Sequence, residues 1–127
     1  KNSEAKYLLG LRSNKPAQGF WFVPGGRVLK NETLNNAFIR IAKEELGIDC
    51  CRDSAQYLGV YEHFYEDCVF DDKISTHYVV LGYKIVADIN IEQLPCSQHQ
   101  KYIWLSKDEL MIHSNVHQHS KWYLAKI

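Results

Sequence analysis

Hydrophobic positions recur at helical spacing in one long stretch of the first half of the chain. The i, i+3, i+4 and i+7 positions of this stretch, which indicate the buried face of a helix, hold Leu34, Ala37, Phe38 and Ile41. Asn31 or Thr33 can cap the start of the helix, because their short side chains accept hydrogen bonds from free backbone N–H groups. We expect the helix to run to about Leu46, with Gly47 as its terminator.

Shorter stretches of hydrophobic and β-branched residues, separated by turn-forming residues, predict strands. These stretches are 5–11, 20–23, 56–65, 76–87 and 102–105. Ser106 can cap a short helix over 107–111, and a last helix is expected at about 114–126. The order of strand, helix, strands and helices predicts an α+β fold, an α/β/α sandwich built on a mixed sheet between helices.

The chain opens with a turn, Lys1 to Glu4, that leads directly into the first predicted strand. A strand that follows a turn usually has a hairpin partner before it, so we expect an N-terminal strand that is missing from this sequence. No internal repeat, low-complexity stretch or linker interrupts the 127 residues. We therefore predict a single domain over residues 1–127.

The composition excludes several classes of protein. Hydrophobic residues make up 46% and charged residues 24%, which argues against disorder, collagen and a coiled coil. Fifteen Lys and Arg residues balance fifteen Asp and Glu residues, so the chain lacks the basic surplus of proteins that coat nucleic acid or anionic membranes. No apolar run reaches the length of a membrane span. The four cysteines form no C-x-x-C pair, which favours reduced thiols in a cytoplasmic protein.

The stretch from Gly26 to Ile48, GRVLKNETLNNAFIRIAKEELGI, carries the candidate chemistry. Gly25 and Gly26 lie between a predicted strand and the predicted helix, where glycine lets the backbone approach a ligand closely. Glu45 lies four residues after Ile41 and extends the apolar stripe of the helix. A carboxylate there is costly unless a partner or a cation neutralises it. The alternative interpretation is an ordinary helix with a solvated, charged end.

This segment resembles the Nudix box, G-x5-E-x7-R-E-U-x-E-E-x-G-U, in which U is a bulky aliphatic residue. The matching positions are Gly26, Glu32, Arg40, Glu44, Glu45, Gly47 and Ile48. Two positions depart from the box. Ile41 stands where the family has a glutamate that normally binds metal, and Ala42 stands at the first U. The loss of that glutamate argues against the ordinary diphosphate chemistry of the family.

The departure at Ile41 is similar to that of one Nudix branch, the GDP-mannose mannosyl hydrolases, which lack this glutamate. The resemblance extends over separate blocks of the chain, namely 7–12, 16–28, 32–34, 63–65, 76–82, 98–99, 104–105 and 115–117. It implies a Nudix fold, a GDP-sugar substrate and a homodimer. It also implies hydrolysis of GDP-mannose or GDP-glucose to GDP and free sugar, by attack of water on the anomeric carbon with inversion.

The resemblance further implies one Mg²⁺ per active site, for which Mn²⁺ can substitute. Its ligands would be the backbone carbonyl of Gly25, the carboxylate of Glu45 and the side chain of Gln98, an all-oxygen set that suits a hard cation. Because glutamine is neutral, this set binds metal more weakly but repels a diphosphate less. Glu44 lies four residues after Arg40 and is expected to pair with it, or alternatively to add an outer contact to the metal site.

Catalytic and substrate-binding roles also follow from the resemblance. His99 would be the general base, since a neutral imidazole is available near neutral pH. Arg12 would bind the β-phosphate and Tyr78 would donate its hydroxyl to the leaving phosphate, so both are catalytic and substrate-binding candidates. Arg27 would bind diphosphate or sugar, and His63 would touch the sugar. Each residue has a plain alternative: a solvated histidine, an exposed or structural arginine, a core tyrosine, or a histidine with a structural hydrogen bond.

The remaining polar residues of interest are interpreted as structural. Arg40 and Glu32 are expected to form an ion pair that orients the box helix. His113, His117 and His119 are interpreted as part of a polar loop-to-helix junction and not as a zinc site. Two rival functions stay open. One is a conventional Nudix pyrophosphohydrolase that releases GMP and a sugar phosphate, and the other is a non-catalytic domain that binds a nucleotide sugar.

Overall fold

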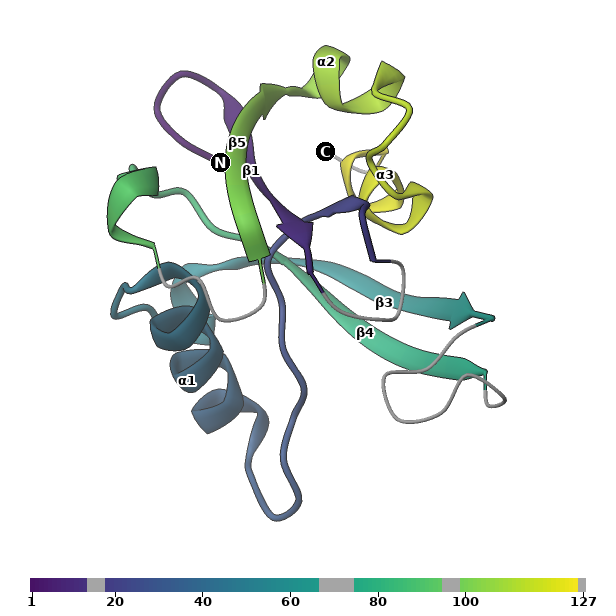
Figure 1. Ribbon diagram of the computed structural model, residues 1–127. Helices are drawn as coiled ribbons and strands as arrows, with labels where there is room; N and C mark the ends of the chain where they lie inside the picture. Colours follow the sequence, from purple (N-terminus) through teal and green to yellow (C-terminus); the bar gives the residue numbers. More distant parts are fainter. Residues whose placement is uncertain (14–17, 67–74, 95–98, 126–127) are drawn as a thin grey trace.

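The computed structural model describes residues 1–13, 18–66, 75–94 and 99–125. Figure 1 shows strands in the centre, one helix on one side of them and two helices on the other. This arrangement confirms the predicted α+β sandwich. In chain order, the strands and α-helices of the described residues are β1 (Lys6–Arg12), β2 (Trp21–Phe22), α1 (Leu34–Leu46), β3 (Gln56–Tyr65), β4 (Thr76–Lys84), β5 (His99–Ser106), α2 (Lys107–Ile112) and α3 (Gln118–Leu124).

β1 is the central strand of a three-stranded antiparallel sheet with the order β2–β1–β5. Tyr7 pairs with Leu105 in the β1–β5 ladder, and an irregularity between Gly10 and Arg12 brings Arg12 opposite His99. The backbone therefore pairs a candidate phosphate-binding residue with the candidate general base. The ladders are antiparallel, and a parallel bridge joins β2 to the segment before α3.

β3 and β4 form a second antiparallel sheet, in which His63 lies opposite Tyr78. Residues directly opposite each other lie on the same face of a sheet, and neighbours along a strand lie on opposite faces. The face with His63 packs against Tyr123 of α3, with ring centroids 5.7 Å apart. The other face carries Tyr83, whose ring meets that of Phe38 of α1 at 5.2 Å. The two helices α1 and α3 therefore contact opposite faces of this sheet.

The ends of α1 follow the sequence closely. Thr33 caps the helix, because its side chain accepts a hydrogen bond of 3.1 Å from a backbone N–H of the first turn. Gly47 ends it in the left-handed region with a φ of 66°. Ala37 is buried as expected, but Leu34 is 44% exposed. The assignment of Leu34 to the buried face is wrong, since the first turn of the helix borders a surface hollow.

The C-terminal half departs from the sequence prediction mainly in length. Ser106 caps α2 as expected, with reciprocal hydrogen bonds to Glu109. The last helix is shorter than the predicted 114–126, because His117 takes the N-cap position and its side chain accepts a hydrogen bond from the backbone of His119. β5 begins earlier than expected.

The core lies between the three-stranded sheet, β3 and the C-terminal helices. It consists of Tyr7, Leu9, Tyr61, Leu105, Leu110, Val116, Tyr123 and Leu124.

At the N-terminus, the Lys1 amino group donates to the backbone oxygen of Ile85 at 2.8 Å. The strand expected before Lys1 stays a prediction. Across the described ranges, none of the helices combines the length and the apolar character needed to cross a membrane.

Candidate functional site

A cavity of about 910 Å³ lies between α1, β1 and the β3–β4 sheet and reaches α3. Its lining includes six of the residues that the sequence singled out, namely Arg12, Gly25, Arg27, Glu45, His63 and Tyr78. Gln98 lies outside the described residues. His99 is placed by its backbone, which pairs with Arg12. The fold thus gathers candidates from five segments of the chain around one space.

Glu45 is the buried carboxylate of the cavity wall. It is 5% exposed, and its Oε1 atom has no hydrogen-bond partner among the described residues. Burial and, to a smaller extent, the nearby charge of Glu44 raise its pKa to about 7, against the opposing positive charge of Arg12. An ionised carboxylate in this position needs a positive partner. An enclosed, unpartnered oxygen beside a glycine turn fits the ligand that a divalent cation requires.

The glycine turn packs directly on α1. A Cβ atom on Gly26 would lie 2.9 Å from Cγ1 of Ile41, so the backbone here approaches the helix as closely as only glycine allows. A Cβ atom on Gly25 would meet no described atom within 4 Å, so this glycine borders open space. Ile41 therefore fills the space under one glycine and leaves the other accessible. The apolar side chain stands where a second carboxylate would enter the site.

The other two box glutamates are engaged by Arg40. Its Nε donates to Glu32 Oε2 at 2.8 Å, its Nη2 donates to Glu32 Oε1 at 2.9 Å, and its Nη1 donates to Glu44 Oε2 at 3.0 Å. Nη2 also donates to the backbone oxygen of Arg27 at 2.6 Å. The hydrogen bonds from Arg40 and from the Leu29 backbone lower the pKa of Glu32 to about 2. The expected Arg40–Glu32 pair is present, and Glu44 pairs with Arg40, as the sequence favoured.

Arg12 lies close to the carboxylate and to an aromatic ring. Its guanidinium carbon stands 5.9 Å from the ring centre of Phe22, the last residue of β2. Arg12 and Arg27 both line the cavity, so positive charge is available to an anionic ligand on the side of β1 and of the glycine turn. Tyr78 is partly buried on β4, with its ring 6.1 Å from that of Tyr65.

A cluster of imidazole and phenol rings forms the far wall of the cavity. His63 Nε2 and the Tyr123 hydroxyl are 3.0 Å apart, and the His63 ring is stacked on that of His119 at 4.2 Å. Burial lowers the pKa of both His63 and His119 to about 4, so both rings are neutral at pH 7. The hydroxyl of Ser120 accepts a hydrogen bond of 3.1 Å from the backbone N–H of Val23, just before the glycine turn.

Sequence reasoning did not find Tyr123 or Ser120. Tyr123 lies four residues after His119, so helical spacing alone places the two on one face of α3. Their meeting with His63 brings together residues 60 positions apart, which no local pattern reveals. Within the described ranges, no group of three or more His, Cys, Asp or Glu side chains is placed to hold a metal ion. A cation beside Glu45 would therefore rely on backbone and amide oxygens for its other protein ligands.

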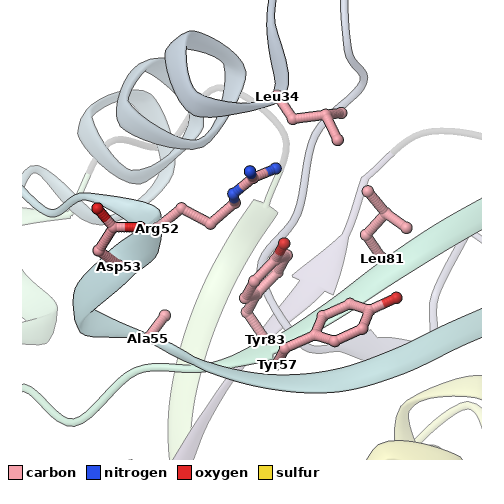
Figure 2. A pocket seen from close by; sticks show the side chains of 7 residues that line it. All are labelled: Leu34, Arg52, Asp53, Ala55, Tyr57, Leu81 and Tyr83. Atoms are coloured by element: carbon pink, nitrogen blue, oxygen red, sulfur yellow. The ribbon is translucent and has the colours of Figure 1, made fainter.

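A second hollow of about 490 Å³ opens beside Leu34, the first residue of α1 (Figure 2). The guanidinium of Arg52 extends toward the space between Leu34 and the ring of Tyr83. Arg52, Leu34 and Tyr83 line both the hollow and the main cavity, together with Leu81. Among the residues that the structure describes, none of the predicted site residues lines this hollow. It adjoins the candidate site without containing any of its chemistry.

Comparisons with known proteins agree with this architecture. The family model described as NUDIX domain matches residues 1–125. The "Low-salt glycan biosynthesis protein Agl8" of Haloferax volcanii is 47% identical over 85 residues, which cover 67% of this chain and 53% of that protein. The chain thus spans about half the length of this curated relative.

Two solved structures show the same fold at low sequence identity. A MutT protein from Methanosarcina mazei Go1 has a TM-score of 0.69 at 22% identity, with 98% of this chain and 84% of that chain covered. The NUDIX domain of Shewanella oneidensis NrtR, complexed with ADP ribose, has a TM-score of 0.65 at 18% identity, with coverage of 94% and 75%. At these identities the likeness concerns the fold alone.

Proposed function

The chain belongs to the Nudix hydrolase superfamily, and from this premise we propose that it hydrolyses GDP-mannose or GDP-glucose to GDP and free sugar with the help of Mg²⁺. Water attacks the anomeric carbon, the bond from that carbon to the β-phosphate oxygen breaks, and GDP leaves with the electron pair. The resemblance to GDP-mannose mannosyl hydrolases supports this reaction. The relative Agl8 is named for glycan biosynthesis, which fits a substrate that carries a sugar.

The observation that carries the proposal is the side chain at position 41. Ile41 packs under Gly26 and lines the cavity near Glu45, so among the described residues one buried carboxylate serves this part of the site. Glu44 does not replace the missing glutamate, because its side chain is 61% exposed and paired with Arg40. A site with one carboxylate favours a single cation held near the diphosphate over a cluster that activates water at phosphorus.

The proposed metal ligands are the carbonyl of Gly25, the carboxylate of Glu45 and the side chain of Gln98, with Mn²⁺ able to replace Mg²⁺. A divalent cation bound there offsets the negative charge that grows on the departing diphosphate. The unpartnered Oε1 of Glu45 is the feature of the fold that fits this group. Gln98 enters the set by resemblance.

The remaining roles belong to side chains of the cavity. Arg12 binds the β-phosphate, because a guanidinium offers parallel N–H donors to phosphate oxygens. Tyr78 donates its hydroxyl to the same leaving phosphate, and Arg27 binds the diphosphate or the sugar. His99 takes the proton of the attacking water as the general base, a role that rests on the resemblance. His63 contacts the sugar. We also propose that the protein acts as a homodimer.

The test is to identify the products of GDP-mannose hydrolysis with Mg²⁺ in ¹⁸O-labelled water. The proposal predicts GDP and mannose, with the label in mannose. GMP and mannose 1-phosphate, with the label in a phosphate, would instead establish the conventional pyrophosphohydrolase. Tight binding of GDP-mannose without turnover would favour a binding domain.

Two neighbouring glutamates supply a matched pair of variants. Glu45→Gln should abolish the Mg²⁺-dependent rate, because it replaces the buried ligand. Glu44→Gln makes the same chemical change one residue earlier, at an exposed, ion-paired position, and should retain most of the activity. Equal losses in both variants would contradict the assignment of Glu45 as the metal ligand. His99→Gln should lose turnover while it still binds GDP.

A further inference from the structure

Tyr123 and His63 form a buried hydrogen bond at the edge of the candidate site. The Tyr123 hydroxyl lies 3.0 Å from His63 Nε2, and both side chains are buried, at 8% and 6% exposure. One face of the imidazole is covered by His119, whose ring is nearly parallel to it at 16°. These contacts fix the orientation of a ring that lines the cavity.

The direction of this hydrogen bond follows from the available partners. Burial raises the pKa of the Tyr123 hydroxyl, so it keeps its proton at neutral pH and needs an acceptor. In the described part of the chain, His63 Nε2 is the hydrogen-bond partner of that hydroxyl. If Nε2 carried a proton and donated a hydrogen bond to the Tyr123 oxygen, the phenolic O–H would be left without an acceptor. Donation from Tyr123 to an unprotonated Nε2 satisfies both groups.

The proton of the neutral imidazole must then reside on Nδ1. Among the described residues, the enclosed side-chain nitrogens and oxygens without a partner are Glu45 Oε1 and His119 Nδ1. His63 lines the cavity, and its Nδ1 is not among these enclosed atoms, so an N–H group on Nδ1 is not sealed off within the protein.

We propose that Tyr123 is a positioning residue that holds His63 in the Nδ1-protonated form, so that His63 donates a hydrogen bond to an oxygen atom of the substrate. A sugar hydroxyl or a phosphate oxygen can accept this bond. The same tautomer prevents His63 from acting as a general base toward the cavity, because the nitrogen that is not bound by Tyr123 already carries the proton. The substrate class in this inference rests on the proposed function, whereas the tautomer does not.

The tautomer can be measured directly by long-range ¹H–¹⁵N NMR on protein labelled with ¹⁵N-histidine, in the absence of substrate. His63→Asn identifies the His63 signals among the six histidines. The expected spectrum shows Nε2 as the unprotonated nitrogen and Nδ1 as the protonated one. Tyr123→Phe should replace this single form by a mixture of the two tautomers. A protonated Nε2 in the unmodified protein, or an unchanged spectrum in Tyr123→Phe, would overturn the proposal.

Tyr61→Phe is the matched control. Tyr61 is a buried tyrosine that packs against Tyr123 edge to face at 4.6 Å, but its hydroxyl donates to the backbone oxygen of Leu58. Removal of the Tyr61 hydroxyl tests whether the loss of any hydroxyl from this cluster disturbs His63. The spectrum of His63 should be unchanged in Tyr61→Phe. A tautomer mixture in this variant as well would assign the effect to general loosening of the cluster and refute the specific role of Tyr123.

Kinetics with GDP-mannose provide the second measurement. If Tyr123→Phe leaves the donor form about half populated, KM should rise about twofold with kcat nearly unchanged. His63→Asn should raise KM about fivefold, as expected for the loss of one hydrogen bond to the substrate. Unchanged KM in both variants would refute the substrate contact. Absence of turnover with both GDP-mannose and GDP-glucose would refute the proposed function and leave the NMR result as the test of the tautomer.

Discussion

Replacement of Glu45 by glutamine should stabilise the protein in the absence of divalent cations. Glu45 has a folded-state pKa of about 7, above its ordinary value of 4.5, mainly because the carboxylate is buried. The folded chain therefore binds more protons than the unfolded chain in this range, so stability falls as the pH rises from about 4.5 to 7 and stays low above it. The shift corresponds to about 3 kcal/mol at pH 8. Glutamine keeps the shape and removes the charge.

The assay is thermal and urea unfolding in the presence of a chelator, at pH 5 and at pH 8. At pH 8, Glu45→Gln should exceed the unmodified protein by up to about 3 kcal/mol, or on the order of 10 °C in Tm. At pH 5 the difference should shrink to about 1 kcal/mol, because most of the buried carboxyl is protonated there. Glu44→Gln, at the exposed neighbouring position, should change stability by less than about 0.5 kcal/mol at either pH.

Addition of Mg²⁺ should reverse the order of the two proteins. A cation bound at the proposed site would stabilise the unmodified protein according to the cation concentration, whereas Glu45→Gln lacks the proposed ligand and should respond little. Two results would refute the reasoning. One is a stability difference between Glu45→Gln and the unmodified protein that is no larger at pH 8 than at pH 5. The other is an equal response of both proteins to Mg²⁺.

Two further predictions concern the wall formed by α3. His63 and His119 have pKa values of about 4, below the ordinary 6.5, so the stability that they contribute is complete above pH 6.5 and is lost as the pH falls toward 4. At pH 5 the loss should be about 2 kcal/mol for each ring, and His119→Asn should flatten the pH dependence of urea unfolding. Ser120→Ala should cost about 1 kcal/mol in urea unfolding, because the partly buried N–H of Val23 loses its acceptor. A cost of zero would show that this N–H finds another partner.

The sequence was sufficient where local chemistry decides the structure. Thr33 and Gly47 mark the ends of α1, since an N-cap and a left-handed C-terminal residue depend on neighbouring backbone groups alone. The position of Glu45 on the buried stripe also follows from helical spacing. Leu34 fails the same rule. A stripe shows which residues share a face, but it does not show how far the covering strands extend along the helix.

The site itself divides in the same way. The spacing of the box predicts the contacts of Arg40 with Glu32 and Glu44. Glu44 lies four residues after Arg40 on α1, and Glu32 lies eight residues before it, in the loop that precedes the helix. The sequence predicted His63 but not its contact with Tyr123, because β3 and α3 are brought together only by the tertiary fold. His63 was a candidate because residues 63–65 resemble the Nudix branch, whereas no pattern near Tyr123 indicated that it contacts His63.

The three glutamates of the box, Glu32, Glu44 and Glu45, differ in their surroundings in the fold. Glu32 is held by two hydrogen bonds from Arg40, and its low pKa keeps it ionised at neutral pH. Glu44 shares the same arginine and faces solvent. These two carboxylates fix the loop after the glycine turn to the helix. Glu45 is left as the box carboxylate that is both enclosed and unpartnered, so its high pKa measures an electrostatic need that the described protein groups do not meet. The apolar side chain of Ile41 also lines the cavity, so the described part of the site offers one buried carboxylate to the proposed cation.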